Sequence, residues 1–242
     1  MILEGDVSVK AALLGKKRRV NKVYLDVRRK DRNAGFILRT CAEAGVETMR
    51  ISREEIDRMA SGRTHGGLIA DADARLYDDL SMCTGTDVPF VVFLEGVEDP
   101  FNLGYIMRTL YSAGCSGLIL KRRNWENAEP VIVRSSAGAS EYLTTVLSDD
   151  PVSDLQSLKQ KGLRCYAAMR KDAVPYYEED YAGPMILMIG GEMRGLSSSV
   201  LALSDRNIYI PYMNDFRNAL NAAGAASALA FEVVRQRMYR GE

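Results

Sequence analysis

The sequence predicts an α/β protein whose C-terminal domain is built on a parallel sheet with helices on both faces, preceded by a smaller α/β domain. Short apolar runs alternate with helical patterns along the chain, which is the pattern of consecutive β-α-β units. Two of these runs, residues 90–94 and 185–189, are apolar at every position. Such strands are typical of the centre of a parallel sheet that is covered on both faces.

Residues 1–75 are predicted to form the small domain. Its helical patterns fall at residues 6–15, 32–44 and 53–60, and its strands at residues 23–27, 46–51 and 68–72. Gly45 follows the second helix, where glycine commonly ends a helix. Ser52 and Glu55 have the spacing of a capping box, which predicts the start of the third helix. A glycine-rich loop, residues 61–67, precedes the last strand.

Residues 76–88 are polar and rich in turn formers, so they predict a linker, and residues 89–242 are predicted to form the second domain. Its strands are predicted at residues 90–94, 118–121, 163–169, 185–189 and 207–210, and its helices at residues 102–113, 130–136, 150–160 and 220–238. The small residues at 135–140 predict a turn. Residues 170–183 are polar and are expected to loop outward.

Net charge does not indicate a nucleic-acid partner, because Lys plus Arg and Asp plus Glu are each 32. Local charge does, since basic side chains outnumber acidic ones twelve to six in the first fifty residues. Such an excess can track a phosphate backbone, and a solvated surface is the alternative explanation. The candidate RNA-binding residues are Lys16, Lys17, Arg18, Arg19, and, from the glycine-rich loop, Arg63 and His65. For His65 a purely structural role in the turn is the alternative.

Cysteine and histidine usage excludes several classes of site. The four cysteines are far apart with no C-x-x-C pair, which favours neither a zinc ribbon nor a disulfide framework. His65 is the only histidine, so histidine metal clusters and histidine-dependent triads are mostly excluded. The chain shows no run of about 18 apolar residues and no signal-peptide pattern, and we expect a soluble, cytoplasmic protein without a metal.

Three segments concentrate unusual residues. They are EGVEDPFNLGYIMRT at residues 95–109, GGEMRGL at 190–196, and IPYM at 210–213 followed by ALN at 219–221. The glycines of the second segment could be sharp turns only. They do not form a dinucleotide-binding fingerprint, because they follow a late strand instead of the first one. Glycine-rich turns after buried strands do let a small ligand approach the backbone.

In order and spacing, the three segments resemble the motifs of the SpoU/TrmH family of RNA 2′-O-methyltransferases in the SPOUT superfamily. Those motifs are usually D-P-x-N-x-G-x-x-x-R-T, G-x-E-x-x-G-[LIM], and I-P-M followed by S-L-N. This chain departs in two ways: Ala219 stands where the family usually has Ser, and the connection from Pro211 to Leu220 is about one residue longer. The resemblance implies a deep trefoil knot in the C-terminal domain. The first domain resembles the ribosomal-protein-like RNA-binding domain of many members.

The resemblance also implies S-adenosylmethionine as cofactor. Backbone groups at Gly190, Ile210 and Leu220 would hold it, with Met213 lining an apolar slot and Gly195 completing the turn. A flat apolar slot with a few backbone donors and acceptors suits adenine. Asn221 is predicted to begin the last helix and to fix the third motif.

Arg108 would act on the ribose hydroxyl. A guanidinium is a poor base, so Arg108 is expected to hold the neighbouring phosphate and to polarise the hydroxyl, and whether it takes the proton stays open. Asn102 would orient Arg108 or the ribose, since both are expected to point to one side of their helix. Glu192 would hold the motif turns or pair with a cation, and a structural carboxylate is the alternative.

We therefore expect a methyltransferase that acts on the ribose 2′-hydroxyl of ribosomal RNA, of the 23S type. Transfer RNA is the alternative substrate. A protein that keeps the fold but not the chemistry is the alternative of another class, supported by Ala219, and a nicotinamide enzyme comes third. The resemblance implies a homodimer, for which the last helix offers a face of small residues. These are Ala222, Ala223, Ala225 and Ala226.

Overall fold

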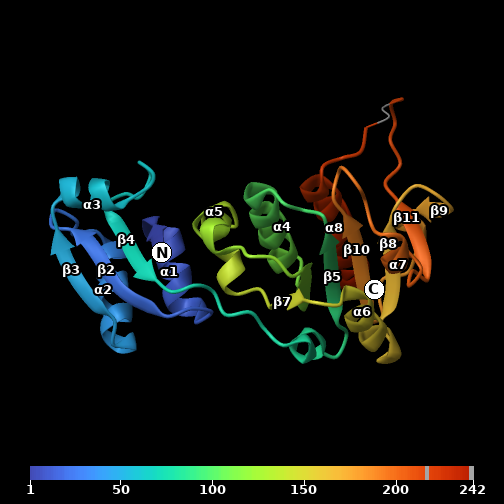
Figure 1. Ribbon diagram of the computed structural model, residues 1–242, viewed down its shortest axis with the longest axis horizontal. Helices are drawn as coiled ribbons and strands as arrows, with labels where there is room; N and C mark the ends of the chain where they lie inside the picture. The colour runs from blue at the N-terminus through green and yellow to red at the C-terminus, as the bar shows by residue number, and fades with distance from the viewer. Residues whose placement is uncertain (216–217, 240–242) are drawn as a thin grey trace. The chain divides into compact units, whose positions relative to one another are not determined.

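The computed structural model describes residues 1–215 and 218–239. Contacts divide the chain into two compact units (Figure 1). The N-terminal unit holds Met1–Leu76 together with Asn124–Tyr142, and the C-terminal unit holds Tyr77–Arg123 together with Leu143–Glu242. The N-terminal unit therefore takes in a second segment, which in sequence lies between two strands of the C-terminal sheet.

A mixed sheet of four strands forms the frame of the N-terminal unit. The strand order is β1-β4-β2-β3, in which β2 and β3 are parallel and the other pairs are antiparallel. Its strands are β1 (Ile2–Glu4), β2 (Val20–Asp26), β3 (Glu47–Ile51) and β4 (Leu68–Ala72). Its first helices are α1 (Gly5–Gly15), α2 (Arg32–Ala44) and α3 (Arg53–Met59). Strand β1 was not predicted, because three residues are too few to show a period.

The helix boundaries of this unit follow from the expected caps. The side chain of Ser52 accepts a hydrogen bond from the Glu55 amide at 3.2 Å, and the Ser52 amide donates to the Glu55 carboxylate at 2.8 Å. The capping box is thereby confirmed. Gly45 ends α2 with a φ of 67°, a left-handed conformation that glycine adopts without strain.

The second segment of the N-terminal unit packs on α1. It consists of η2 (Glu126–Ala128), α5 (Glu129–Ser135) and η3 (Ala139–Glu141). The predicted small-residue turn has a packing reason, since a Cβ at Gly138 would collide with the Ala11 side chain. A Cβ at Gly15 would likewise overlap the backbone of Glu141. Helix α1 and this turn therefore touch at two glycines, where any larger residue would force them apart.

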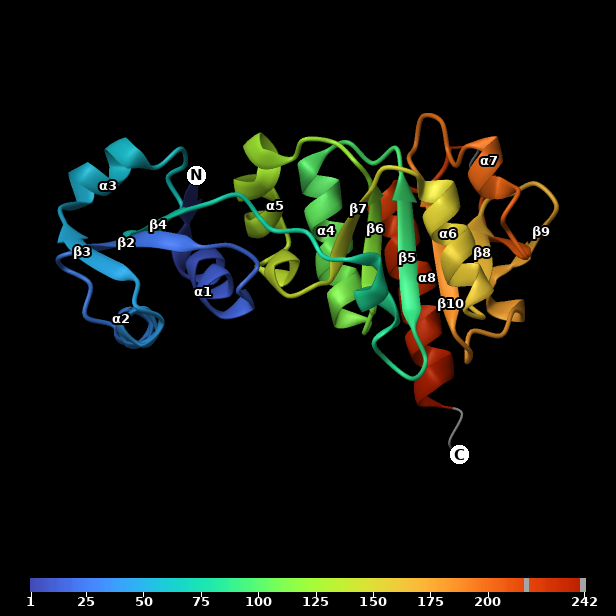
Figure 2. The ribbon, with the colours of Figure 1, turned by 60° about the horizontal axis from the view of Figure 1, so that its bottom comes forward.

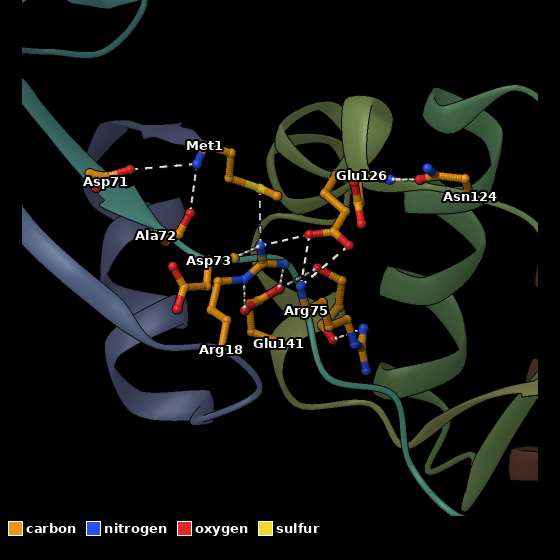
Figure 3. Close-up of polar contacts among 11 residues, drawn as sticks. Met1, Arg18, Asp71, Ala72, Asp73, Arg75, Asn124, Glu126 and Glu141 are labelled. Carbon is orange, nitrogen blue, oxygen red and sulfur yellow. Dashed lines mark hydrogen bonds and ion pairs between the residues drawn. The ribbon is translucent and has the colours of Figure 1, made fainter.

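A buried cluster of charges joins the same two parts of the unit (Figure 3). Arg18 donates from Nη1 to Glu129 at 2.7 Å, and from Nε and Nη2 to Glu141 at 2.8 and 3.0 Å. The three side chains are at most 4% exposed. Burial disfavours the charge on Arg18, but the hydrogen bonds and attraction of the two carboxylates outweigh it and raise the pKa of the guanidinium.

Arg18 is thus not an RNA ligand, and that expectation is wrong. Its position in a run of four basic residues indicated an exposed side chain, yet its donors are turned to two carboxylates and to the Asp73 carbonyl, 3.1 Å from Nη1. Lys16 and Arg19, the first and last residues of this basic run, are exposed.

The C-terminal unit contains a sheet of seven parallel strands, in the order β7-β6-β5-β10-β8-β11-β9. The strands are β5 (Phe90–Glu95), β6 (Gly117–Lys121), β7 (Thr145–Ser148), β8 (Arg164–Ala168), β9 (Ala173–Pro175), β10 (Met185–Gly190) and β11 (Arg206–Tyr209). Its helices are η1 (Leu80–Thr84), α4 (Pro100–Ser112), α6 (Pro151–Gln160), η4 (Tyr176–Glu178), α7 (Ser198–Leu201) and α8 (Ala222–Met238). The predicted parallel sheet is confirmed.

Helices cover both faces of this sheet, as predicted. Val91 and Phe93 of β5 pack in one cluster with residues of α6 and α7. The alternate residues of the strand, among them Val92, point to the opposite face. Helices α4 and α8 pack against each other, and Figure 2 shows α6 in front of the sheet and α8 behind it.

Two strands of the large sheet escaped prediction. Strand β7 has only four residues, and β9 has three within the stretch expected to be a loop. Strand β10 is inserted between β5 and β8, although β6, β7 and β8 precede it in sequence. Such late insertion suits a knotted chain, and the knot itself stays a prediction. Among the described residues, no helix has the length and apolar character needed to cross a membrane.

Replacing Arg18 by Ala should strongly destabilise the protein. Two buried carboxylates would lose their counter-charge, which costs about 3–5 kcal/mol in the free energy of unfolding. Arg19→Ala is the matched control, because this neighbour is exposed, and it should change stability by less than about 0.5 kcal/mol. Urea unfolding measures both. Equal effects of the two substitutions would contradict the role given to Arg18.

Candidate functional site

The three sequence motifs lie at the ends of strands in the C-terminal unit. From β5 the chain proceeds to β6 on one side, whereas β10 and β8 lie on the other side of β5. In open α/β sheets, ligands bind outside the carboxyl ends of the strands where the order reverses in this way. The first motif leaves β5, the second leaves β10, and the third leaves β11. The fold therefore brings the first two motifs to one edge of the sheet, on adjacent strands.

Glycines let the first two motif loops touch backbone to backbone. A Cβ at Gly191 would overlap the carbonyl of Gly96, and a Cβ at Gly190 would overlap Gly195 and Leu196. Gly96 and Gly195 also have positive φ angles, 74° and 63°. Each glycine is thus required by packing or conformation. The first role of these glycines is to let the two loops pack together. From the sequence alone, this role could not be distinguished from a role in letting a ligand approach the backbone.

Glu95 ties these loops with both its backbone and its side chain. Its carbonyl accepts a hydrogen bond from the Gly191 amide at 2.6 Å, and its carboxylate accepts one from the Ser197 amide at 2.7 Å. Gly195 in turn donates to the Gly191 carbonyl at 2.9 Å. The turn that follows β10 is therefore fixed at its beginning and its end by the last residue of β5.

The third motif forms a loop that leads into α8. Ile210 is half-buried, Leu220 is 40% exposed, and Met213 is 99% exposed. Asn221 accepts a hydrogen bond from the Gly224 amide at 2.8 Å, so the predicted helix start is confirmed. The Leu220 amide donates to the Tyr212 hydroxyl at 2.8 Å.

Helix α4 carries the two catalytic candidates of the first motif. Its N-cap is Asp99, whose carboxylate accepts from the Asn102 amide at 2.8 Å. Arg108 is exposed, and its guanidinium has no hydrogen-bond or ion-pair partner among the residues that the structure describes. Asn102 and Arg108 are six positions apart, which turns their side chains about 120° from each other around the helix. The expectation that both point to one side is wrong.

Glu192 and Met193 stand at the tip of the second motif loop. Both are exposed, Met193 to 97%. The motif turn is held by Glu95, so the structure gives Glu192 no part in holding it. An exposed carboxylate beside an exposed thioether on a tightly fixed turn is available to a ligand or to another chain.

In the N-terminal unit the candidate residues separate into buried and exposed ones. His65 is 1% exposed, its Nε2 lies 2.9 Å from a carboxylate oxygen of Asp57, and its Nδ1 accepts from the Gly67 amide at 3.2 Å. It is a structural histidine, and the expectation that it contacts RNA is wrong. Arg63 of the same loop is exposed.

The cysteines are not placed for a role as nucleophiles. All four thiols are free and buried, and burial raises the pKa of Cys83 and of Cys115 to about 12. Neutral buried thiols are poor nucleophiles. In the part of the chain that the structure describes, no group of three or more His, Cys, Asp or Glu side chains could hold a metal ion.

Glu95, Ser197 and Tyr212 were not predicted as site residues. Glu95 could have been noticed as the only charged residue in an otherwise apolar strand. The contact of Ser197 depends on a partner 102 positions away, which no local pattern reveals. Tyr212 stands between Pro211 and Met213, where the I-P-M pattern has no residue, and that extra residue was the available signal.

Fold and loops together define an α/β protein with closely packed motif loops at the carboxyl edge of a parallel sheet, the edge where open α/β proteins bind their ligands. Comparison with known families narrows this class. Residues 89–231 match the model of the SpoU rRNA Methylase family, and residues 2–77 match that of RNA 2′-O ribose methyltransferase substrate binding. The chain belongs to the SpoU rRNA methylase family.

Several relatives and solved structures match this chain over nearly its whole length, and one matches a part of it. The 23S rRNA (guanosine-2′-O-)-methyltransferase RlmB of Shewanella oneidensis is 28% identical over 240 residues, which are 98% of this chain and 97% of the relative. Among solved structures, the SpoU methyltransferase AviRb from Streptomyces viridochromogenes superposes with a TM-score of 0.83 at 24% identity, over 98% of this chain and 90% of that chain. Its complex with AdoMet gives 0.81 at 25% identity, with the same coverage. A solved structure described as giving insights into the 2-OH methylation of C/U34 on tRNA is 28% identical to this chain, with a TM-score of 0.56. The match covers 62% of this chain and 97% of that chain.

Removing the Glu95 carboxylate should loosen the second motif loop. Glu95→Ala should speed amide hydrogen exchange at residues 191–197 and lower stability by about 1–3 kcal/mol, since the bond to Ser197 is charge-assisted. Glu95→Gln keeps an acceptor and should retain most of the protection. Glu98→Ala, an exposed acid of the neighbouring loop, is the control. Unchanged exchange in Glu95→Ala would show that the loop does not depend on this contact.

Proposed function

We propose that this protein is an S-adenosylmethionine-dependent enzyme that methylates the ribose 2′-hydroxyl of ribosomal RNA of the 23S type. One observation carries the proposal: a chain of the SpoU rRNA methylase family assembles its first two motifs at the carboxyl edge of the sheet, with their glycine contacts intact. The relative from Shewanella oneidensis is named for 23S rRNA guanosine, which favours this substrate.

The residues present fit the cofactor. Adenosyl and thioether groups need apolar contacts and a few backbone hydrogen bonds. The motif loops offer Met193, Met213 and Leu220 as exposed apolar side chains. Met193 stands on the turn whose backbone is packed tightly at Gly190 and Gly195. When bound, S-adenosylmethionine supplies an electrophilic methyl group on a sulfonium. We assign Gly190, Gly195, Ile210, Met213, Leu220 and Asn221 to its binding or to the shape of its site.

Arg108 is the residue that we assign to the ribose. Its guanidinium is exposed and available, so it can donate bidentate hydrogen bonds to the phosphate beside the target nucleotide. Holding that phosphate would fix the neighbouring 2′-hydroxyl in line for transfer, and positioning of this kind supplies a large part of a rate. Asn102 lies on another side of α4, so it would act on the ribose itself. Glu192, exposed on its turn, would face the substrate or a cation.

An exposed aromatic stripe on α4 supports a homodimer. Phe101 is 45% and Tyr105 50% exposed, and Arg108 continues the stripe, since residues four and three apart share a helix face. A second copy that covered this stripe would complete the surroundings of Arg108. Ala222 and Ala226 of α8 are buried within their own unit, so the part of the expectation that gave them to a partner is wrong.

RNA is the substrate class, and we place its first contact on the N-terminal unit. Residues 2–77 match a substrate-binding family, and Lys16, Lys17 and Arg19 precede β2 without entering the core. A second exposed basic group, Arg28, Lys30 and Arg32, follows the same strand. Seven residues of β2 separate the two groups by about 20 Å. We keep the first group as the RNA ligands, together with Arg63.

Transfer RNA is the second candidate substrate, favoured by the solved structure named for C/U34 methylation. A protein that keeps the fold and binds RNA without transferring a methyl group is the candidate of another class. Ala219 is the observation behind it. We also propose a cytoplasmic setting and a reaction without a metal, both of which fit an enzyme that meets RNA and uses a sulfonium donor.

Arg108→Ala should separate binding from transfer. The variant should bind S-adenosylmethionine as the natural protein does, by calorimetry, yet lose at least about a hundredfold in kcat, because the group nearest the reacting hydroxyl is gone. Transfer is measured with labelled cofactor on deproteinised ribosomal RNA, and a 2′-O-methyl group protects the adjacent linkage from alkali. In the same preparation, light scattering should give twice 26.8 kDa. A natural protein that binds cofactor but modifies no RNA would instead support the binding module.

Removing the basic group before β2 should weaken RNA binding alone. The triple change Lys16→Ala, Lys17→Ala and Arg19→Ala should lower RNA affinity and reduce its salt slope by about one for each phosphate that is no longer neutralised. Cofactor affinity should not change. The matched control changes Arg28, Lys30 and Arg32 to Ala. If only the control set weakens RNA binding, the RNA surface lies at the other end of the strand.

A further inference from the structure

The third motif loop is closed by a tyrosine that stands outside the motif pattern. Tyr212 lies two residues beyond β11 and is half-buried, and its hydroxyl accepts a hydrogen bond from the Leu220 amide at 2.8 Å. The guanidinium of Arg170 lies 4.7 Å from the centre of the Tyr212 ring. The ring is therefore held from one side while its hydroxyl reaches across the loop.

This contact fixes the peptide plane at the motif residue that departs from the family pattern. The Leu220 amide belongs to the peptide that joins Ala219 to Leu220, and a peptide group is planar. One hydrogen bond to that amide therefore orients the whole group, including the Ala219 carbonyl. Asn221 then caps α8 through the Gly224 amide at 2.8 Å. Two side chains, Tyr212 and Asn221, thus set the shape of the chain where the loop enters the helix.

Ala219 cannot take part in such bonding, because it has no side-chain hydroxyl. A serine at this position has a short hydroxyl that can bond nearby backbone groups. In this chain, a hydroxyl instead arrives from Tyr212, at the other end of a loop that is about one residue longer than the pattern. The two departures are therefore related in space, because the Leu220 amide that follows Ala219 donates to the Tyr212 hydroxyl at 2.8 Å.

We propose that Tyr212 is a positioning residue that supplies, from the opposite arm of the loop, the hydroxyl contact that Ala219 lacks. It acts through the Ala219–Leu220 peptide and shapes the part of the third motif that we assign to the cofactor. The inference rests on the proposed function for its consequence on activity. Its structural content, the bond to the Leu220 amide, is independent of the reaction.

A double-mutant cycle tests the proposal. Tyr212→Phe keeps the ring and removes the hydroxyl, and it should raise the Kd for S-adenosylmethionine about three- to tenfold, as expected when one hydrogen bond is removed. Ala219→Ser in the natural protein should change that Kd less than about twofold. In the Tyr212→Phe background, Ala219→Ser should recover most of the affinity, which a merely structural tyrosine would not allow. Tyr177→Phe, an exposed tyrosine outside the motif loops, is the control.

Two outcomes would overturn the proposal: an unchanged Kd in Tyr212→Phe, or an effect of Ala219→Ser that is equal in both backgrounds. Amide hydrogen exchange of Leu220 in the protein without ligand separates this inference from the proposed function. Faster exchange in Tyr212→Phe supports the contact even if the natural protein binds no cofactor, and unchanged exchange refutes it. A natural protein that neither binds S-adenosylmethionine nor modifies RNA would count against the proposed function alone.

Discussion

The site depends on a contact between two backbones. The loop after β5 and the loop after β10 meet at Gly96 and Gly191, and no side chain fits between them. A glycine-rich motif is commonly explained by its ligand, but here the glycines are already required by the protein. Because the two loops cannot separate without breaking the hydrogen bonds that Glu95 accepts from the Gly191 and Ser197 amides, the groups that they carry keep fixed positions before any ligand binds. Preorganisation of this kind is what an enzyme needs in order to orient reactants.

The N-terminal unit depends on a different interaction, the buried pairing of Arg18 with Glu129 and Glu141. Replacing such a cluster by apolar residues often stabilises a protein, so its presence points to specificity more than to stability. The Arg18 guanidinium is planar, so it donates well only to carboxylates that lie in its own plane. The cluster thereby selects residues 124–142 as part of this unit, and the glycines at positions 15 and 138 allow the close approach. The chain consequently passes between the two units three times.

Periodicity and caps were sufficient to predict most helices and the long strands, because their signals are local. The capping box at Ser52 and the apolar strand at Phe90 are examples. Arg18 and His65 were misjudged because polarity predicts exposure. The burial of Arg18 is caused by distant partners, whereas His65 is held by Asp57 and Gly67 in its own part of the chain. The carboxylates that pair with Arg18 lie 111 and 123 positions away. Asn102 and Arg108 show a further limit, since their spacing in sequence suggested a common direction that helical geometry does not provide.

Departures from a motif are usually taken as evidence of lost function, and the third motif shows why that inference is weak. A motif records residue types, whereas chemistry requires groups at positions in space. In this structure a hydroxyl reaches the Ala219–Leu220 peptide from position 212. The one-residue extension and the absent serine therefore do not count as two independent defects. Tyr212 contacts the Leu220 amide in the structure, and the remaining motif residues keep their strand ends and caps. These observations favour an active enzyme with an altered third motif. They do not favour a binding protein whose third motif has lost its function.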